Sequence, residues 1–172
     1  MNTTTHPLRI RTARALPGLR MALEFGDGFE AIVDLAMLIE QSPALRPIVT
    51  KATFEKLTVE EFGRSVLWGD EVADLAADNL RHLAVEQAGG IGHERLAGWM
   101  HANALTQQAA ADVLGLSRRM LNYYLSASKP IPKTVWLACV GLTARAALLD
   151  VAEQHPELRD EVPEAIAMLS AA

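Results

Sequence analysis

Residues 107–126 have the sequence QQAAADVLGLSRRMLNYYLS, and this stretch decides the fold of the second half of the chain. It predicts two short helices that cross steeply. The small side chain of Ala111 allows them to approach closely, and Gly115 suits a tight turn that needs a positive φ. Leu121 and Tyr124, three residues apart, share one face of the second helix, so we expect both in the core.

The two helices are predicted over residues 106–114 and 117–126, with Thr106 and Ser117 as their N-caps. The side chains left on the outer face of the second helix are polar, and none is acidic. Arginine pairs with guanine, and asparagine with adenine, through two hydrogen bonds each. The predicted outward residues are Ser117, Arg118, Arg119, Asn122, Tyr123 and Ser126. For Tyr123, a partly buried ring and a phosphate contact are equally compatible with the pattern.

This stretch resembles the helix-turn-helix of the Cro/C1 repressor (xenobiotic-response-element) family, whose DNA-binding domain is lambda-repressor-like. Alanine at the fifth place, glycine at the ninth and the inward apolar places all match. The continuation over residues 126–138, SASKPIPKTVWLA, resembles the loop and next helix of that family, although Ser128 stands near where many members carry glycine. The resemblance covers about residues 93–140.

The resemblance implies an all-α domain that binds double-stranded DNA with the helix near residues 117–126 in the major groove. Arg118, Arg119 and Asn122 would read base edges, while Ser117, Tyr123 and Ser126 would contact phosphate or a thymine methyl group. Gln107 and Gln108 open the first helix near phosphate, and Gln108 could also brace a base-reading side chain. Lys129 and Lys133 would neutralise phosphates of the flanking strand.

The first half of the chain predicts a small, strand-rich α+β domain. Apolar and polar residues alternate over residues 8–15, 20–25 and 29–34, and Gly26-Asp27-Gly28 separates the last two runs as a hairpin turn. Residues 54–59 and 65–68 are further predicted strands, with Gly63 at the turn between them. Helical patterns occupy residues 35–40 and 79–87, while Pro43 and Pro47 interrupt the segment after the first of these.

Short motifs of this half resemble a bacterial family known as domain of unknown function 2442. They are Gly26-Asp27-Gly28, Val33-Asp34-Leu35, Phe54, Val59, Trp68-Gly69-Asp70 and Asp74-Leu75. The usual Asp-Gly after the tryptophan is replaced by Gly69-Asp70-Glu71. The resemblance covers residues 8–80, and it implies an α+β fold without an established activity. Members of that family are sometimes fused to such a helix-turn-helix.

A glycine-rich segment, Gly89-Gly90-Ile91-Gly92, marks the predicted boundary and is typical of a flexible joint. We therefore expect an α+β domain over residues 1–88 and a helical DNA-binding domain over residues 89–172. In the second domain, helices are also predicted over residues 93–103, from Pro132 to about residue 152, and after Pro156 or Pro163. The apolar helix over residues 135–149 is expected to supply core and dimer contacts, and a strand edge of the first domain is the alternative dimer contact.

The net charge of −5 hides an uneven distribution of charge. Residues 113–149 contain five basic residues and no acid, whereas residues 150–164 contain six acids and one arginine. A local basic face on an acidic protein is compatible with DNA binding of moderate non-specific affinity.

Several classes of function are disfavoured. The single cysteine, Cys139, excludes an internal disulfide and a multi-cysteine zinc site. The five histidines are scattered, and aspartates such as Asp27 and Asp34 are typical turn residues. We therefore expect no enzyme activity, cofactor or metal. The longest apolar run, residues 135–142, is short for a membrane span, and the first residues lack a signal-peptide core, so a cytoplasmic protein is expected.

The sequence thus predicts a transcriptional regulator, more specifically a repressor, that acts as a homodimer on paired half-sites. An alternative is an antitoxin-like interaction module whose acidic first domain binds a protein partner at a strand edge. A third hypothesis is a first domain that senses a small ligand. Neither the operator nor the effector follows from the sequence.

Overall fold

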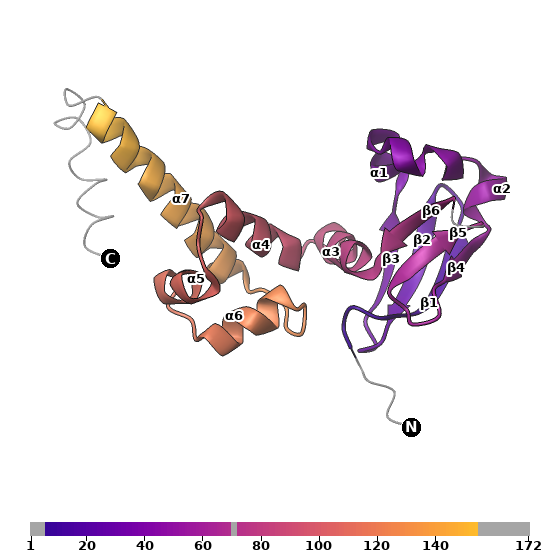
Figure 1. Cartoon of the computed structure of the whole chain (residues 1–172), viewed down its shortest axis with the longest axis horizontal. Coiled ribbons are helices and arrows are strands. Elements are labelled where there is room, and N and C mark those ends of the chain that lie inside the picture. The colour runs from indigo at the N-terminus through magenta and orange to yellow at the C-terminus, as the bar shows by residue number, and fades with distance from the viewer. Residues whose placement is uncertain (1–5, 70–71, 155–172) are drawn as a thin grey trace.

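A computed structural model describes residues 6–69 and 72–154 of the chain. The strands and first helices lie at one end of the molecule, the last helices at the other, and α3 and α4 between them (Figure 1). The first group comprises β1 (Ile10–Leu16), β2 (Arg20–Phe25), β3 (Glu30–Asp34), α1 (Ala36–Gln41), the 3-10 helix η1 (Pro43–Ile48), α2 (Lys51–Phe54), β4 (Leu57–Val59), β5 (Ser65–Trp68) and β6 (Ala73–Ala76). The helices that follow are α3 (Ala77–Gln87), α4 (His93–Ala102), α5 (Gln107–Val113), α6 (Arg118–Leu125) and α7 (Lys133–Gln154).

The fold is mixed α+β, as the sequence predicts. Two three-stranded antiparallel sheets have the orders β1-β2-β3 and β4-β5-β6. The turn at residues 26–28 closes the β2–β3 hairpin, where the Phe25 N–H donates to the Phe29 carbonyl at 2.9 Å. Asp27 and Asp34 serve as turn residues, since their carboxylates accept from the Phe29 and Ala36 N–H groups.

One strand prediction is wrong in part, and one strand was missed. Phe54 ends α2 rather than opening a strand, because the Thr50 hydroxyl caps that helix by accepting from the Thr53 N–H at 3.2 Å. Only Leu57–Val59 of the predicted 54–59 strand is extended. The missed strand, β6, is four residues long and is held by pairing with β5, which a local pattern does not reveal.

The first group of elements packs around one apolar core. Met21, Phe25, Val33 and Val66 are fully buried, and Trp68 is 1% exposed. The indole of Trp68 donates to the Phe54 carbonyl at 3.0 Å, so its one polar group is satisfied inside the core.

The helical group has a second, smaller core. Leu96 of α4, Ala111 of α5, Leu121 of α6 and Cys139 of α7 are fully buried, and Tyr124 is 7% exposed. The predicted core positions Leu121 and Tyr124 are therefore confirmed. Burial raises the pKa of the Cys139 thiol to about 11, so this cysteine is a small apolar side chain rather than a nucleophile.

The junction between α3 and α4 is closely packed, contrary to the flexible joint suggested by its glycines. A Cβ on Gly92 would stand 2.0 Å from the His82 ring, and one on Gly90 would stand 2.8 Å from the Val85 side chain. The Glu86 carboxylate accepts from the Gly92 N–H at 2.6 Å and pairs with Arg95. These glycines therefore allow close approach of the two helices, while the domain limits at residues 88 and 89 stay predictions.

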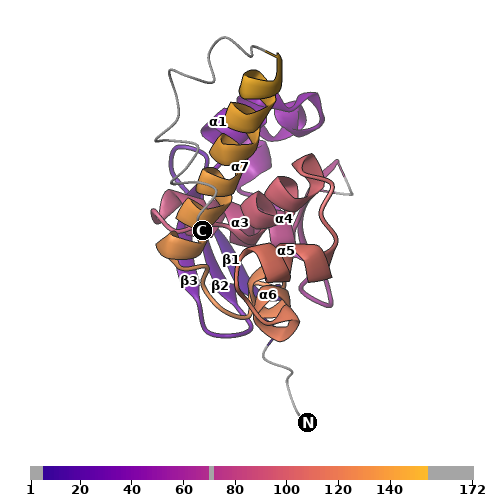
Figure 2. The ribbon, with the colours of Figure 1, turned by 90° about the vertical axis from the view of Figure 1, so that its left-hand side faces the viewer.

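Only the first part of α7 is packed in the core. The rest of this helix extends away from the other helices toward the C-terminal end of the described chain (Figures 1 and 2). Along its length, large apolar side chains lie in solvent, and these are Leu137, Val140, Leu148, Leu149 and Val151. The predicted core role of residues 135–149 is thus confirmed for its beginning alone. The last helix predicted after Pro156 or Pro163 falls outside the described residues.

Within the described residues, α7 is long and apolar enough to cross a membrane by length and composition. The segment Lys133–Val151 has a mean hydropathy of 1.5 with 6% of its residues buried. The apolar run counted in the sequence underestimated this helix because it stopped at Thr143. Arg145 lies within the segment, where a charge would be costly in a bilayer.

Candidate nucleic-acid interface

Helices α5 and α6 form a compact pair joined by a four-residue turn. The Thr106 hydroxyl accepts from the Ala109 N–H, and the Ser117 hydroxyl accepts from the Met120 N–H, each at 3.2 Å. Both predicted N-caps are confirmed.

The turn itself uses the predicted glycine. Gly115 has a φ of +64°, and the Leu116 N–H donates to the Ala111 carbonyl at 2.8 Å. This glycine-ended C-cap satisfies carbonyls that the end of α5 would otherwise leave unpaired. The chain is thereby redirected so that α6 can bury Leu121 and Tyr124 and keep Arg118, Arg119 and Asn122 exposed.

All ten predicted DNA-contacting residues are at least partly accessible. Those classed as exposed are Gln107, Gln108, Ser117, Arg118, Arg119, Asn122, Lys129 and Lys133, and those half-buried are Tyr123 and Ser126. They lie on α5, on α6, on the loop after α6 and at the start of α7. The structure therefore brings six of them onto or beside α6.

Within this set, Tyr123 connects two cations. The Arg119 Nε donates to the Tyr123 hydroxyl at 2.7 Å, and the Arg119 guanidinium lies 5.4 Å from the ring centroid. The Lys129 ammonium lies 5.2 Å from the centroid of the same ring. Tyr123 therefore holds one turn of α6 and the following loop together, a role that its sequence position alone did not reveal.

Arg118 and Asn122 differ from Arg119 in having no side-chain hydrogen bond or ion pair to other residues in the described part of the chain. They stand four residues apart on α6, so they project from the same face. Their donors and acceptors are hence available for a partner in solution.

Besides Arg119 and Tyr123, three further predicted residues already have polar partners. The Gln108 amide donates to the Asp112 carboxylate at 2.8 Å, so it does not brace a side chain of α6 here. Ser117 is used as the N-cap, and the Ser126 hydroxyl shares a 2.8 Å hydrogen bond with that of Ser128. Asp112 was not singled out from the sequence, although it places a negative charge in the last turn of α5.

Comparison with solved structures places the chain in a family. It matches the crystal structure of "Putative DNA Binding Protein NE0471 from Nitrosomonas europaea ATCC 19718" at 37% sequence identity and a TM-score of 0.74. The match covers 80% of this chain and 88% of NE0471. The chain belongs to the NE0471 family. No protein-family model matches the chain, and no curated protein does so either.

The match to NE0471 extends well beyond a single supersecondary element. Because 80% of this chain is covered, the aligned region is larger than either half taken alone. The α+β group and the helical group therefore occur together in the NE0471 family.

Proposed function

We propose that this protein binds double-stranded DNA through the outer face of α6. One observation carries the proposal, namely a face of α6 that is exposed, polar and free of acid, on a helix fixed by its own cap and turn. The similarity to NE0471, a putative DNA binding protein, supports it, given 37% identity over most of both chains. The arrangement of α5 and α6 is also compatible with a helix-turn-helix of the Cro/C1 type.

In this proposal, α6 enters the major groove and its first turns meet base edges. Arg118 and Asn122 have free side chains that suit two-pronged contacts with guanine and adenine. Arg119 is the third base-reading residue, and its hydrogen bond to Tyr123 orders its long side chain before DNA arrives. Because the side chain is already ordered, it loses less conformational entropy when DNA binds.

The residues around α6 are assigned to the DNA backbone. Lys129 and Lys133 neutralise phosphates, and the remaining polar contacts come from Gln107, Gln108, Ser117, Tyr123 and Ser126. Each phosphate contact adds to the salt dependence of binding without reading sequence. The function we propose is accordingly that of a cytoplasmic transcriptional regulator, acting as a repressor, without a catalytic step, cofactor or metal.

We further propose that two copies associate through α7. Leu137 is 56% exposed, Val140 49% and Val151 46%, which is unusual for one helix of a protein in water. Leu137, Gly141, Ala144, Leu148 and Val151 recur at intervals of three and four residues, which aligns them along one side of the helix. A second α7 would cover this stripe and would set two copies of α6 on paired half-sites.

The test is a fluorescence-anisotropy titration with fragments of the DNA upstream of the protein's own gene, at two salt concentrations. We expect selective binding of one fragment by the wild type. The Arg118→Ala/Arg119→Ala double variant should bind that fragment at least about tenfold more weakly, because each base contact contributes roughly 1–3 kcal/mol. The matched control is Arg14→Ala/Arg46→Ala, which removes two exposed arginines of the α+β group and should bind as the wild type does.

A second candidate function is a protein-interaction module, and β3 favours it. This strand is at the edge of its sheet, and Ile32 on it is 59% exposed. An extended peptide could add to such an edge. If the upstream fragments fail to bind even at low salt, a partner that copurifies with the wild type but not with an Ile32→Lys variant would favour this function.

A further inference from the structure

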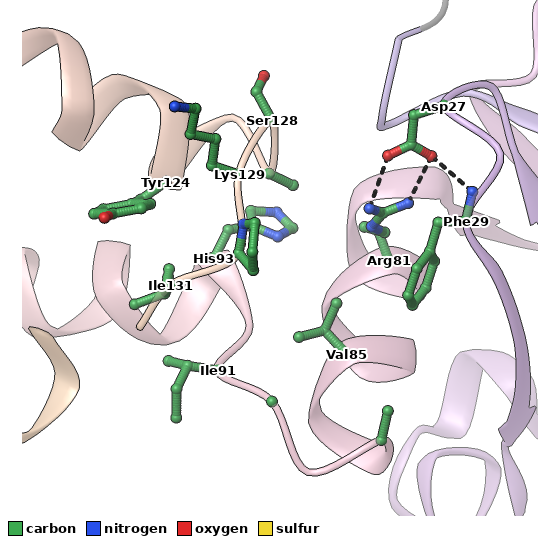
Figure 3. A pocket seen from close by; sticks show the side chains of 14 residues that line it. Asp27, Phe29, Arg81, Val85, Ile91, His93, Tyr124, Ser128, Lys129 and Ile131 are labelled. Carbon is green, nitrogen blue, oxygen red and sulfur yellow. Dashed lines mark hydrogen bonds and ion pairs between the residues drawn. The ribbon is translucent and has the colours of Figure 1, made fainter. Parts of the chain in front are cut away.

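A cavity of about 370 Å³ lies where the α+β group meets the helical group (Figure 3). One wall is formed by Asp27 and Phe29 of the β2–β3 hairpin with Arg81 of α3. The opposite wall is the end of α6 and the loop after it, with Val85 and Ile91 along the side between them. Its volume is within the range typical of small-molecule sites, and its position between two domains is also typical.

The first wall is built around a buried arginine. The Arg81 guanidinium makes two hydrogen bonds to the Asp27 carboxylate, at 2.9 and 3.0 Å, and lies 3.9 Å from the centroid of the Phe29 ring. The side chain of Arg81 is 91% buried, since 9% is exposed, and its Nε has no hydrogen-bond partner in the described structure. Because this Nε is itself shielded from solvent, the wall presents a paired guanidinium and the Phe29 ring to the cavity.

The Asp27–Arg81 pair stays ionised at neutral pH. Burial acts to raise the pKa of the Asp27 carboxyl, but hydrogen bonds from Arg81 and the Phe29 N–H outweigh it and lower that pKa below 3.8. The pair therefore contributes no net charge to the cavity.

The opposite wall carries the uncompensated charge. Lys129 lines the cavity from the loop after α6 and forms no ion pair with an acid among the described residues. Its ammonium rests 5.2 Å from the centroid of the Tyr123 ring, and its side chain is exposed, so the ammonium can swing toward a ligand. Beside it, Ser128 supplies a hydroxyl, while Val85, Ile91 and Ile131 supply apolar surface.

We propose that this cavity binds a small organic monoanion with an apolar body, of the class of aromatic carboxylates. The net charge of one on Lys129 matches a single carboxylate. The apolar body would displace water from between Val85, Ile91 and Ile131, which favours binding in proportion to the apolar surface buried. The ligand would touch both walls and so bridge the α+β group and the loop that follows α6.

This site also has a consequence for DNA binding, and only that consequence rests on the proposed function. Lys129 is assigned to a phosphate, and the same ammonium would be neutralised by a carboxylate in the cavity. Loss of one phosphate contact should weaken DNA binding. It should also reduce, by about one, the steepness with which the logarithm of the binding constant falls with the logarithm of the salt concentration. The ligand would thus act as an inducer that releases a repressor.

The experiment is isothermal titration calorimetry of the full chain, without DNA, using 1-naphthoate and its neutral analogue 1-naphthamide. We expect one naphthoate per chain, with naphthamide at least tenfold weaker. Lys129→Ala should weaken naphthoate binding at least fivefold, and Val85→Trp should abolish it by filling the cavity. Met37→Ser, which removes an exposed apolar side chain of α1, is the matched control and should bind naphthoate as the wild type does.

Two outcomes would overturn the site. One is the absence of naphthoate binding to the wild type, and the other is undiminished binding to Val85→Trp. Because Val85 is half-buried, Ser128→Trp serves as a second blocking variant at an exposed loop position and must lose binding as well. Since these titrations contain no DNA, a protein that binds naphthoate but no upstream fragment would retain the site and contradict the proposed function alone.

Discussion

Helices α6 and α7 follow each other in the chain but differ in how far their apolar side chains are buried within one copy of the protein. In α6 the apolar residues Leu121 and Tyr124 are buried and the polar ones face solvent. In α7 only the first part reaches the core, and large apolar residues such as Leu137 and Val140 lie in solvent. The difference is that α6 buries its apolar residues within one chain, whereas α7 leaves large apolar side chains exposed.

The largest expected effect is a difference in the free energy of unfolding when leucine is replaced by alanine on each of the two helices. Leu121→Ala should lower the free energy of unfolding by roughly 2–5 kcal/mol, because it opens a cavity in the core of the helical group. Leu148→Ala, at a side chain that is 37% exposed, should change it by less than about 0.5 kcal/mol at a dilution where the chain is monomeric. Urea unfolding monitored by circular dichroism measures both changes. Equal losses of unfolding free energy would show that Leu148 of α7 is packed as Leu121 of α6 is.

The next effect concerns association through α7. Leu137→Glu/Leu148→Glu places charges on the apolar stripe and should convert a dimer to a monomer, because a buried unpaired carboxylate is costly. Light scattering after gel filtration gives the mass directly. The control Met37→Glu/Phe62→Glu alters two exposed apolar residues of the α+β group, 69% and 59% exposed, and should leave the mass unchanged. A wild type that is monomeric at all concentrations would contradict the role given to α7.

A smaller effect depends on pH at the junction between the two groups. Burial, followed by the neighbouring His82, lowers the pKa of His93 below 6.5, while Asp78 opposes this shift and Arg81 reinforces it. The unfolded chain then binds a proton that the folded chain resists, so stability should fall as pH decreases below about 6.5. His93→Gln should flatten this dependence in thermal unfolding between pH 7 and 5, whereas His101→Gln, at an exposed position, should not.

The smallest expected effect tests whether Tyr123 acts by ordering the Arg119 side chain or by contacting DNA itself. Tyr123→Phe removes the hydroxyl that accepts from Arg119 and retains the ring beside Lys129. The loss of one accessible hydrogen bond should weaken binding to the selected DNA fragment by about 0.5–1.5 kcal/mol, or roughly two- to tenfold. Anisotropy at fixed salt provides the measurement, and a loss as large as that of Arg118→Ala/Arg119→Ala would show that Tyr123 itself makes the main contact.

The sequence predicted the local features of the site well because they depend on neighbours along the chain. Thr106 and Ser117 cap helices that begin one residue later, and Gly115 adopts the positive φ that the turn requires. Each of these outcomes follows from the chemistry of a few consecutive residues. The β2–β3 hairpin was predictable for the same reason.

Contacts between distant residues were not predictable in this way. Arg81 and Asp27 are 54 residues apart, and nothing near either residue indicates that they form a buried pair. The contact of the His82 and His93 rings, with centroids 6.0 Å apart, depends on the packed turn between α3 and α4. Strand β6 likewise depends on its partner β5. Long-range packing, rather than local propensity, determines the junction and its cavity.

The most direct test of the proposed DNA interface is a map of backbone amide shifts in NMR spectra as the selected DNA fragment is added. The proposal predicts the largest shifts at Arg118, Arg119 and Asn122 of α6 and smaller ones at Lys129 and Lys133. Amides of the β3 edge should not move. Shifts concentrated on β3 around Ile32, with α6 unaffected, would contradict it.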